Sequence, residues 1–264
     1  MTQNKVIVVI PLYTTALSDN DLISLHRSIT ILGNHTFAVV CPQSLDLSPL
    51  DSVINKVTHT VIRFNDEFFK GVSGYNKLML SGIFYEKFKD YEYMLICQTD
   101  VYVFKDELLK WCNKGYDYIG APWLASERNF INKGLFVLRN FFKKKKKSTA
   151  HFFKVGNGGF SLRKVAKMYE ITTEQTESIQ HAQENKNPHS HHIEDIYFSL
   201  VAPTLTDMKI PDYKEAVGFS IDRKPHIGVK INGGKLPFAC HGFNKPKVRA
   251  FWEPLIAKAE KEAL

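Results

Sequence analysis

The sequence predicts an α/β fold in which a mainly parallel central sheet is flanked by helices. Strand and helix signals alternate through about the first hundred residues, which is the pattern of parallel strands joined by crossover helices. The apolar segment 93–98 then ends in the polar sequence Gln98-Thr99-Asp100, as expected of a strand whose carboxyl end faces a ligand site. At 264 residues, 44% of them hydrophobic, the chain can bury the core of one such domain.

The individual elements follow from local patterns. A helix is expected to begin at Ser18 or Asn20, either of which can cap it, and to continue to about Leu32, because apolar residues recur on one face. The other expected strands are 6–10, 37–41, 60–64, 118–120, 159–162 and 216–220, and the other expected helices are 74–88, 107–112, 163–169 and 193–201. The polar segment 172–192 indicates a loop or a frayed helix. Without a repeat or an internal boundary, we expect a single domain over residues 1–264.

The cysteines and the N-terminus favour a cytoplasmic protein. Cys41, Cys97, Cys112 and Cys240 form no CxxC pair, and all but Cys112 lie in apolar surroundings, where cysteine behaves as a small buried hydrophobe. The N-terminus does not have the pattern of a secretion signal. The aliphatic run 6–10 is far shorter than the ~20 residues that span a bilayer.

The net charge of +8 is partly local, since Lys143–Lys147 form an unbroken basic run after the apolar and aromatic segment 135–142. Such a run suits an anionic membrane surface at the inner face of the membrane, and a solvated loop tip is the alternative. Nucleic acid is not expected as a partner, because the basic residues are confined to this cluster and no recognition motif accompanies them.

Asp100 is the first candidate site residue. A carboxylate at the end of a buried strand can hold a divalent cation or a ribose hydroxyl, and the alternative is an ordinary turn aspartate.

The glycine-rich segment 155–163 is the second candidate. Three glycines around Asn157 allow positive φ angles and close approach of a ligand to the backbone, and a tight hairpin is the alternative. The segment is not GxGxxG and precedes a strand, which argues against a dinucleotide-dependent dehydrogenase.

An acidic pair and a histidine complete the candidates. Glu194 and Asp195 precede an apolar helical stretch, where they could complement the helix dipole or supply a general base. His189, His191 and His192 just before them are interpreted as part of a solvated stretch and not as a metal cluster. His241 ends an apolar strand and could bind a metal or phosphate, with a buried core histidine as the alternative. The basic residues that follow it suit a diphosphate, namely Lys245, Lys247 and Arg249.

Taken together, and in their order along the chain, these candidate segments resemble a bacterial family of uncharacterised proteins assigned to the GT-A glycosyltransferase superfamily. The resemblance covers nearly the whole chain except the lysine-rich insertion and residues 172–192. The stretches that carry it are 8–13, 68–77, 116–123, 156–163, Glu194-Asp195 and Cys240-His241.

The resemblance implies a GT-A-like, Rossmann-type fold with a smaller mixed C-terminal sheet region. It implies transfer of a sugar from a nucleotide-diphosphate donor, expected to be a UDP-sugar, to a hydroxyl of a glycan or glycolipid, as in polysaccharide or lipopolysaccharide assembly. Residues 1–104 would form the nucleotide-binding half and residues 105–264 the acceptor and catalytic half. GT-A enzymes usually hold Mn²⁺ or Mg²⁺ through a DxD motif. Here Gln98 replaces the first acid, so metal dependence is left open.

The resemblance also implies roles for particular residues. Asp195, with Glu194 second, would be the base of an inverting reaction, and Asp100 and His241 would be the metal ligands. Trp123 and Asn157 would contact the acceptor, and Trp123 could stack on a sugar face. The implied donor-binding residues are Pro11, Tyr13 and Thr14 at the nucleobase, Lys77 at the ribose or diphosphate, and Asp100, Gly158, Gly159, Lys245 and Lys247.

Two other functions remain open from the sequence. A nucleotidyltransferase would need a second metal-binding acid near Asp100, for which Asp106 is the close candidate. A sugar- or membrane-binding module that has lost catalysis together with the first DxD acid is the second alternative.

Overall fold

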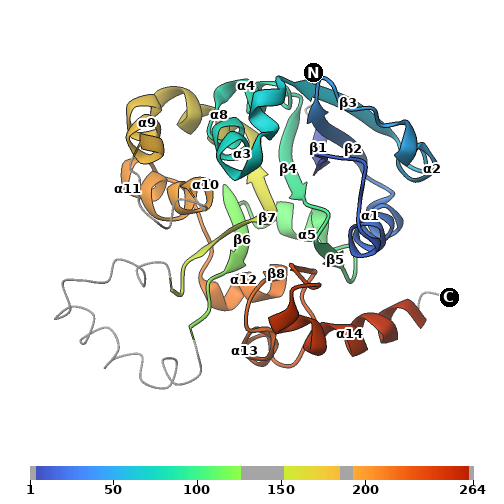
Figure 1. Cartoon of the computed structure of the whole chain (residues 1–264). Helices are drawn as coiled ribbons and strands as arrows, with labels where there is room; N and C mark the ends of the chain where they lie inside the picture. Colours follow the sequence, from blue (N-terminus) through green and yellow to red (C-terminus); the bar gives the residue numbers. More distant parts are fainter. Residues whose placement is uncertain (1–3, 126–151, 185–192, 262–264) are drawn as a thin grey trace, which may run out of the picture.

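Six strands form the central sheet of the computed structural model, which describes residues 4–125, 152–184 and 193–261. The strand order is β3-β2-β1-β4-β7-β6, as Figure 1 shows. The parallel strands are β1 (Asn4–Pro11), β2 (Thr36–Pro42), β3 (His59–Phe64) and β4 (Tyr91–Cys97). β7 (Val155–Lys164) runs antiparallel to β4, and β6 (Tyr118–Pro122) runs antiparallel to β7. The mainly parallel sheet is therefore confirmed.

Helices cover both faces of this sheet because its strands are apolar on both sides. In β1, Val6, Val8 and Ile10 join one buried cluster, whereas Ile7 and Val9 join the other. The first cluster includes buried residues of α1 (Asp19–Leu32), α2 (Asp51–Ile54), α5 (Leu108–Cys112), α12 (Tyr213–Phe219), α13 (Pro225–Ile231) and α14 (Pro246–Lys261). The second includes buried residues of α3 (Gly71–Met79), α4 (Gly82–Glu86), α8 (Val165–Glu174) and α9 (Thr176–Glu184).

A smaller mixed sheet lies at the carboxyl side of β4. Its order is β5-β9-β8, with β5 (Val101–Val103) antiparallel and β8 (Ser220–Ile221) parallel to β9 (Ala239–His241). The expected smaller mixed sheet is therefore present. It joins a strand that directly follows the site sequence 98–100 to two strands from the last fifty residues of the chain.

Several expected elements need correction. The single helix expected over 74–88 is two helices, α3 and α4, because Ser81 adopts an extended conformation and its hydroxyl donates to the Leu78 carbonyl at 2.6 Å. The strand expected over 216–220 is mostly helix α12, since the Asp212 side chain caps it by accepting a hydrogen bond from the Lys214 backbone N–H at 2.8 Å.

The polar segment 172–192 also contains more helix than expected. α8 continues to Glu174 and α9 follows over Thr176–Glu184, while residues 185–192 lie outside the described ranges. The helix expected over 193–201 is α10 (Ile193–Ile196) followed by a π-helical turn, η5 (Tyr197–Val201), and α11 (Ala202–Leu205). Short 3₁₀ turns, η1 (Ser48–Leu50) and η2 (Asp66–Phe69), precede α2 and α3.

Three smaller expectations concern the cap of α1, the cysteines and contact with a membrane. Ser18 caps α1 in a reciprocal capping box with Asp21, so the first of the two expected caps is the one used. All four cysteines are buried and free, including Cys112. None of the helices in the described ranges has the length and apolar character needed to cross a bilayer. The expected membrane-facing run Lys143–Lys147 and the histidines 189–192 lie outside the described residues.

Candidate active site

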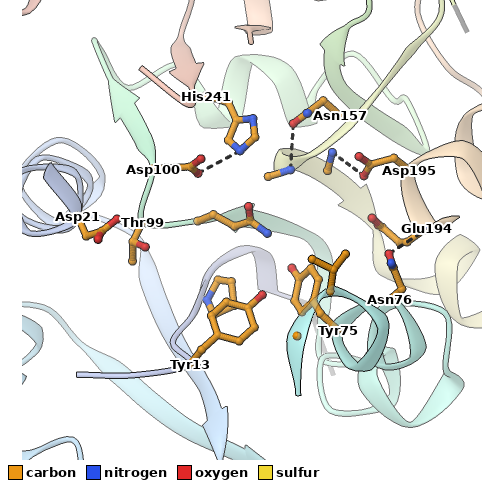
Figure 2. Close-up of a pocket in the computed structure, with 16 residues that line it drawn as sticks. Tyr13, Asp21, Tyr75, Asn76, Thr99, Asp100, Asn157, Glu194, Asp195 and His241 are labelled. Atoms are coloured by element: carbon orange, nitrogen blue, oxygen red, sulfur yellow. Dashed lines mark hydrogen bonds and ion pairs between the residues drawn. The ribbon is translucent and has the colours of Figure 1, made fainter. Parts of the chain in front are cut away.

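A cavity of about 510 Å³ opens at the carboxyl ends of β1 and β4. Figure 2 shows the side chains that line it. This volume falls within the ~300–1,000 Å³ of small-molecule sites, and the place is where open α/β sheets bind ligands. The lining residues come from the ends of β1 and β4, from α3, β7, α10 and β9, and also from the start of α1: Pro11, Tyr13, Asp21, Gly71, Val72, Tyr75, Asn76, Gln98, Thr99, Asp100, Asn157, Gly158, Gly159, Glu194, Asp195 and His241.

One side of the cavity is an alternating cluster of acids and bases. The pairing of Val101 with His241 and of Ile221 with Cys240 places Asp100 and Asp222 on two sides of the His241 ring. His241 Nε2 lies 3.0 Å from Asp100 Oδ1, and its Nδ1 lies 3.5 Å from Asp222 Oδ1. The Lys245 ammonium lies 3.6 Å from a carboxylate oxygen of each acid. The two short strands thus assemble a charge-balanced group of four side chains.

The charges in this cluster hold one another ionised. Burial opposes the charge on Asp100, but His241 and Lys245 outweigh it and lower the pKa of Asp100 to about 2. Burial likewise opposes the charge on His241, and the two neighbouring acids raise the pKa of His241 to about 9. The pKa of Asp222 is lowered by His241, Lys245 and Arg223 in spite of burial.

The opposite side of the cavity carries the buried acidic pair. Glu194 is 3% exposed and Asp195 is 8% exposed. Glu194 Oε1 pairs with the Arg163 guanidinium at 2.6 Å, whereas Asp195 Oδ1 accepts a hydrogen bond from the Gly158 N–H at 2.8 Å. Burial raises the pKa of Asp195 well above its ordinary value, and the charge and hydrogen bond of Glu194 add to this against the lowering effects of Arg163 and Gly158.

Arg163 is the buried side chain that holds this acidic pair in position. It is fully buried, and its Nε donates to Ser161 Oγ at 3.0 Å while its Nη1 donates to the Tyr85 hydroxyl at 2.9 Å. The guanidinium also lies 5.4 Å from the centre of the Tyr118 ring. The buried positive charge of Arg163 is therefore paired directly with Glu194, and it also lowers the pKa of Asp195.

The glycines of β7 are required by close packing. A Cβ at Gly158 would lie 2.4 Å from Asp195 Oδ1, and one at Gly159 would lie 2.2 Å from His241 Nε2. Gly156, Gly158 and Gly159 all have negative φ angles, so the positive φ that glycine permits is not used in this segment, and close packing is the reason for glycine here. The two neighbouring glycines bring the acidic pair and the histidine against one strand.

The third part of the cavity is aromatic. Tyr13 is 40% exposed, and its ring packs edge-on against Tyr75 and Phe69 at centroid distances of 5.6 and 5.8 Å. Pro11 lies beside it at the end of β1. An exposed ring held by two others is a surface on which a planar base can stack.

The structure brings most, but not all, of the expected residues to the cavity. Pro11, Tyr13, Asp100, Asn157, Gly158, Gly159, Glu194, Asp195 and His241 line it, and Lys245 reaches Asp100. The other four expected residues do not line it. Lys77 and Lys247 are exposed elsewhere, Thr14 Oγ1 accepts from the Ala16 N–H, and Trp123 pairs through its backbone with Phe153 and Lys154.

Asp106, the acid that a nucleotidyltransferase would need, is committed elsewhere. Its carboxylate pairs with His35 at 2.8 Å and accepts from the Leu108 N–H at 3.0 Å. The acid that does lie near Asp100 is Asp222, which the sequence reasoning missed together with Arg163 and Asn76. A weak signal existed for Asp222 alone, as an acid directly after an apolar segment.

A divalent cation would find two ligands at the cavity. Asp100 Oδ1 and His241 Nε2 lie 3.0 Å apart at the cavity, and both are ligand types that Mn²⁺ accepts, provided that His241 gives up its Nε2 proton when the ion binds. Within the described ranges no group of three or more His, Cys, Asp or Glu side chains is arranged to hold a metal. Two protein ligands fit an ion that completes its coordination with water and substrate phosphates.

Comparisons with known proteins agree with this architecture. A family model described as "Protein of unknown function (DUF5672)" matches residues 58–241. No curated protein is similar enough in sequence to match the chain.

Among solved structures, the galactosyltransferase LgtC in complex with donor and acceptor sugar analogues has a TM-score of 0.56 at 14% identity, covering 89% of this chain and 86% of that one. Mouse xyloside xylosyltransferase 1 has a TM-score of 0.52 at 10% identity, covering 90% of this chain and 97% of that one. The glycosyltransferase GlyE of Streptococcus pneumoniae TIGR4 has a TM-score of 0.52 at 12% identity, covering 92% of this chain and 56% of that one. The α/β fold with its mostly parallel sheet is therefore the GT-A glycosyltransferase fold.

Proposed function

Because the chain belongs to the DUF5672 family and has the GT-A fold, we propose that it transfers a sugar from a nucleotide-diphosphate donor to a hydroxyl acceptor. The observation that carries the proposal is the division of one cavity into three chemically different parts. An aromatic surface at Tyr13, a charged cluster at Asp100 and His241, and the acidic pair at Asp195 suit in turn a base, a diphosphate and a sugar (Figure 2). We propose a UDP-sugar donor and a glycan or glycolipid acceptor.

The charged cluster would bind the diphosphate and the metal. Asp100 and His241 would hold Mn²⁺ or Mg²⁺, which when bound neutralises the negative charge that develops on the leaving diphosphate. The Lys245 side chain is 45% exposed and can leave its two acids to contact a phosphate oxygen. A preorganised cluster of this kind stabilises the leaving group without reorganising during the reaction.

Asp195 is the proposed base. Its raised pKa makes it a stronger base than an ordinary carboxylate, and the hydrogen bond from Gly158 fixes the carboxyl group at the cavity wall. In an inverting reaction Asp195 would take the proton of the acceptor hydroxyl as that oxygen attacks the anomeric carbon. Glu194 is the second choice, because its Oε1 is already paired with Arg163. The anomeric configuration of the product, read by NMR, tests the inverting assignment.

The proposal is tested by screening UDP- and GDP-sugars for hydrolysis and transfer, with wild type and Asp195→Asn side by side. We expect turnover with at least one donor, and a loss of ~10²–10⁴ in transfer rate in the variant, because the amide keeps the shape and removes the base. Donor affinity should stay within a few-fold.

The matched control is Asp207→Asn, which alters an acid whose side chain is 86% exposed and pairs with Lys167 at 2.8 Å. Near-normal turnover of Asp195→Asn would remove Asp195 from the base role. Release of pyrophosphate from a nucleoside triphosphate and a sugar phosphate, without any sugar transfer, would identify a nucleotidyltransferase.

A further inference from the structure

Asn76 is a buried polar residue of the cavity to which no role has been given. It lies on α3, lines the cavity and is only 5% exposed. α3 is held tightly at this point, because a Cβ at Gly74 would lie 2.5 Å from the Glu67 carbonyl oxygen of η2. The close fit of Gly74 against η2 restricts movement of the Asn76 backbone relative to the cavity.

The orientation of the Asn76 amide is determined by its neighbour. Its Oδ1 accepts a hydrogen bond from the Glu194 backbone N–H at 3.3 Å, drawn as a dashed line in Figure 2. A backbone N–H can only donate, so the oxygen of the amide must face it and the NH₂ group must face the other way. The direction of the two N–H donors of the Asn76 amide follows from this hydrogen bond.

Those donors have no acceptor among the residues that the structure describes. Asn76 Nδ2 is buried and makes no hydrogen bond. Buried amide donors are almost always paired, because an unpaired donor has lost its hydrogen bonds to water and gained none from the protein. In a cavity wall, an unpaired donor that cannot rotate away is a place for an acceptor atom of a ligand.

The neighbouring acid indicates which ligand atom this is. Glu194 Oε1 is paired with Arg163, its Oε2 would lie 2.8 Å from a Cβ built on Gly158, and the carboxylate also shares a hydrogen bond with Asp195. A carboxylate has about four lone-pair sites, so Glu194 can accept one more hydrogen bond, and its backbone N–H is the group that fixes the Asn76 amide. A sugar hydroxyl can pair with a carboxylate and an amide at once, since its O–H donates and its oxygen accepts. A nucleobase would instead stack at Tyr13, in the aromatic part of the cavity.

We infer that Asn76 donates a hydrogen bond to one hydroxyl oxygen of the transferred sugar, and that Asn76 and Glu194 together determine which sugar is accepted. This rests on the proposed glycosyl transfer and deepens it. A site built to pair with a hydroxyl discriminates strongly against the analogue that lacks it, because both protein groups are then buried without partners. We expect discrimination of at least ~10²-fold at one position of the sugar.

The experiment compares the best donor from the UDP-sugar screen with its 2-, 3-, 4- and 6-deoxy derivatives where these positions carry hydroxyls. Values of kcat/KM are measured for wild type, Asn76→Ala and Asn76→Asp. For wild type, kcat/KM should be much lower with one deoxy donor than with the parent donor. For both variants, the kcat/KM values with that deoxy donor and with the parent donor should differ by no more than about tenfold. Asn76→Asp keeps an oxygen that accepts from the Glu194 N–H but removes the amide N–H group. It therefore separates the effect of losing the hydrogen-bond donor from the effect of disturbing the fold.

Asn113→Ala, at the exposed end of α5, is the matched control and should discriminate as wild type does. UDP affinity and melting temperature report that each variant is folded. Unchanged discrimination in both Asn76 variants, with wild type active on the parent donor, would overturn the inference and leave the proposed function in place. If wild type neither binds UDP nor turns over any donor, the proposed function fails and this inference fails with it.

Discussion

Arg163 controls the acidic pair without touching the cavity surface. Because its guanidinium is committed to Glu194, the charge of that acid is compensated, while Asp195 retains a raised pKa from burial and from its neighbour. The arrangement separates two adjacent carboxyl groups into one that is paired with a buried guanidinium and one whose raised pKa suits a base.

This leads to a prediction about pH. In wild type, kcat/KM should rise with pH through a limb that lies well above pH 4, because Asp195, as the proposed base, would have to lose its proton to act. In Glu194→Gln the limb should move to lower pH, since removing the negative charge removes a cause of the raised pKa and leaves Arg163 to lower it further. The measurement is a pH–rate profile of both proteins. A limb that stays in place would show that Asp195 is not the titrating group.

At the level of residues, the sequence predicted the strand-end groups and the acidic pair of α10 at the cavity, but it chose the wrong residue on α3. Asp100 and His241 could be placed because each directly follows or ends a buried strand, and strand ends converge at one edge of a sheet. Lys77 could not be placed, because on a helix one residue changes the direction by about 100°, so Asn76 faces the cavity and Lys77 faces solvent. Asp222 was missed since the strand before it has only two residues.

At the level of elements, β7 is the part of the fold that organises the site. It runs antiparallel between β4 and β6 and presents Gly158 to the acidic pair and Gly159 to His241. A side chain at either position would separate two parts of the cavity. The absence of side chains on this stretch is therefore what makes the site compact.

Gly158→Ala should accordingly damage stability and activity together. Its methyl group would lie 2.4 Å from Asp195 Oδ1, 2.8 Å from Glu194 Oε2 and 3.1 Å from Arg163 Nη2, all in buried surroundings. We expect about 1–3 kcal/mol of lost stability, as for other overpacked sites. Chemical denaturation and the transfer rate measure the two effects.

Gly218→Ala in α12 is the control, since its closest contact would be 3.3 Å and alanine favours helix. A Gly158→Ala protein as stable and active as Gly218→Ala would show that the acidic pair can move aside, against the rigid arrangement described above.

The strands were easier to predict than the helices for a physical reason. Three of the four parallel strands, β1, β2 and β4, are mostly buried on both faces and are therefore nearly continuous apolar runs, which are visible in sequence. β3 lies at the edge of the sheet and is largely exposed, with Phe64 as its buried residue. The break between α3 and α4 depends on one serine hydroxyl that bonds its own backbone, and α9 depends on packing of a largely polar segment through Ile179. Neither leaves a clear periodic pattern.

At the level of the whole molecule, the two expected halves of the chain meet in one sheet and one cavity. Tyr13 and Asp100 come from the first half, whereas Gly158, Asp195 and His241 come from the second. A ligand that spans these residues therefore stabilises the folded chain against unfolding.

UDP with Mn²⁺ should raise the melting temperature of the protein. A ligand at 100 times its Kd stabilises the native state by about 2.7 kcal/mol, and each kcal/mol shifts the melting temperature by about 2–4 °C at this size. EDTA should reduce the shift in wild type, and Asp100→Ala should show a small shift with or without EDTA, because it lacks one of the two proposed ligands. Thermal denaturation under the four conditions provides the test. If the melting temperature of wild type rises equally with and without EDTA, UDP binding does not depend on a metal, and the proposed metal site is wrong.

The small sheet β5-β9-β8 also has a consequence for biosynthesis. All six strands of the central sheet have been synthesised once the chain reaches Lys164, but His241 lies 77 residues further on. At ~5–20 residues per second, a translating ribosome adds the histidine roughly 4–15 seconds after the last strand of that sheet. During this interval the nascent chain has Asp100 without its partner from β9. A transcript cut short in the same stretch would encode the complete central sheet but not His241, and so would lack one wall of the cavity.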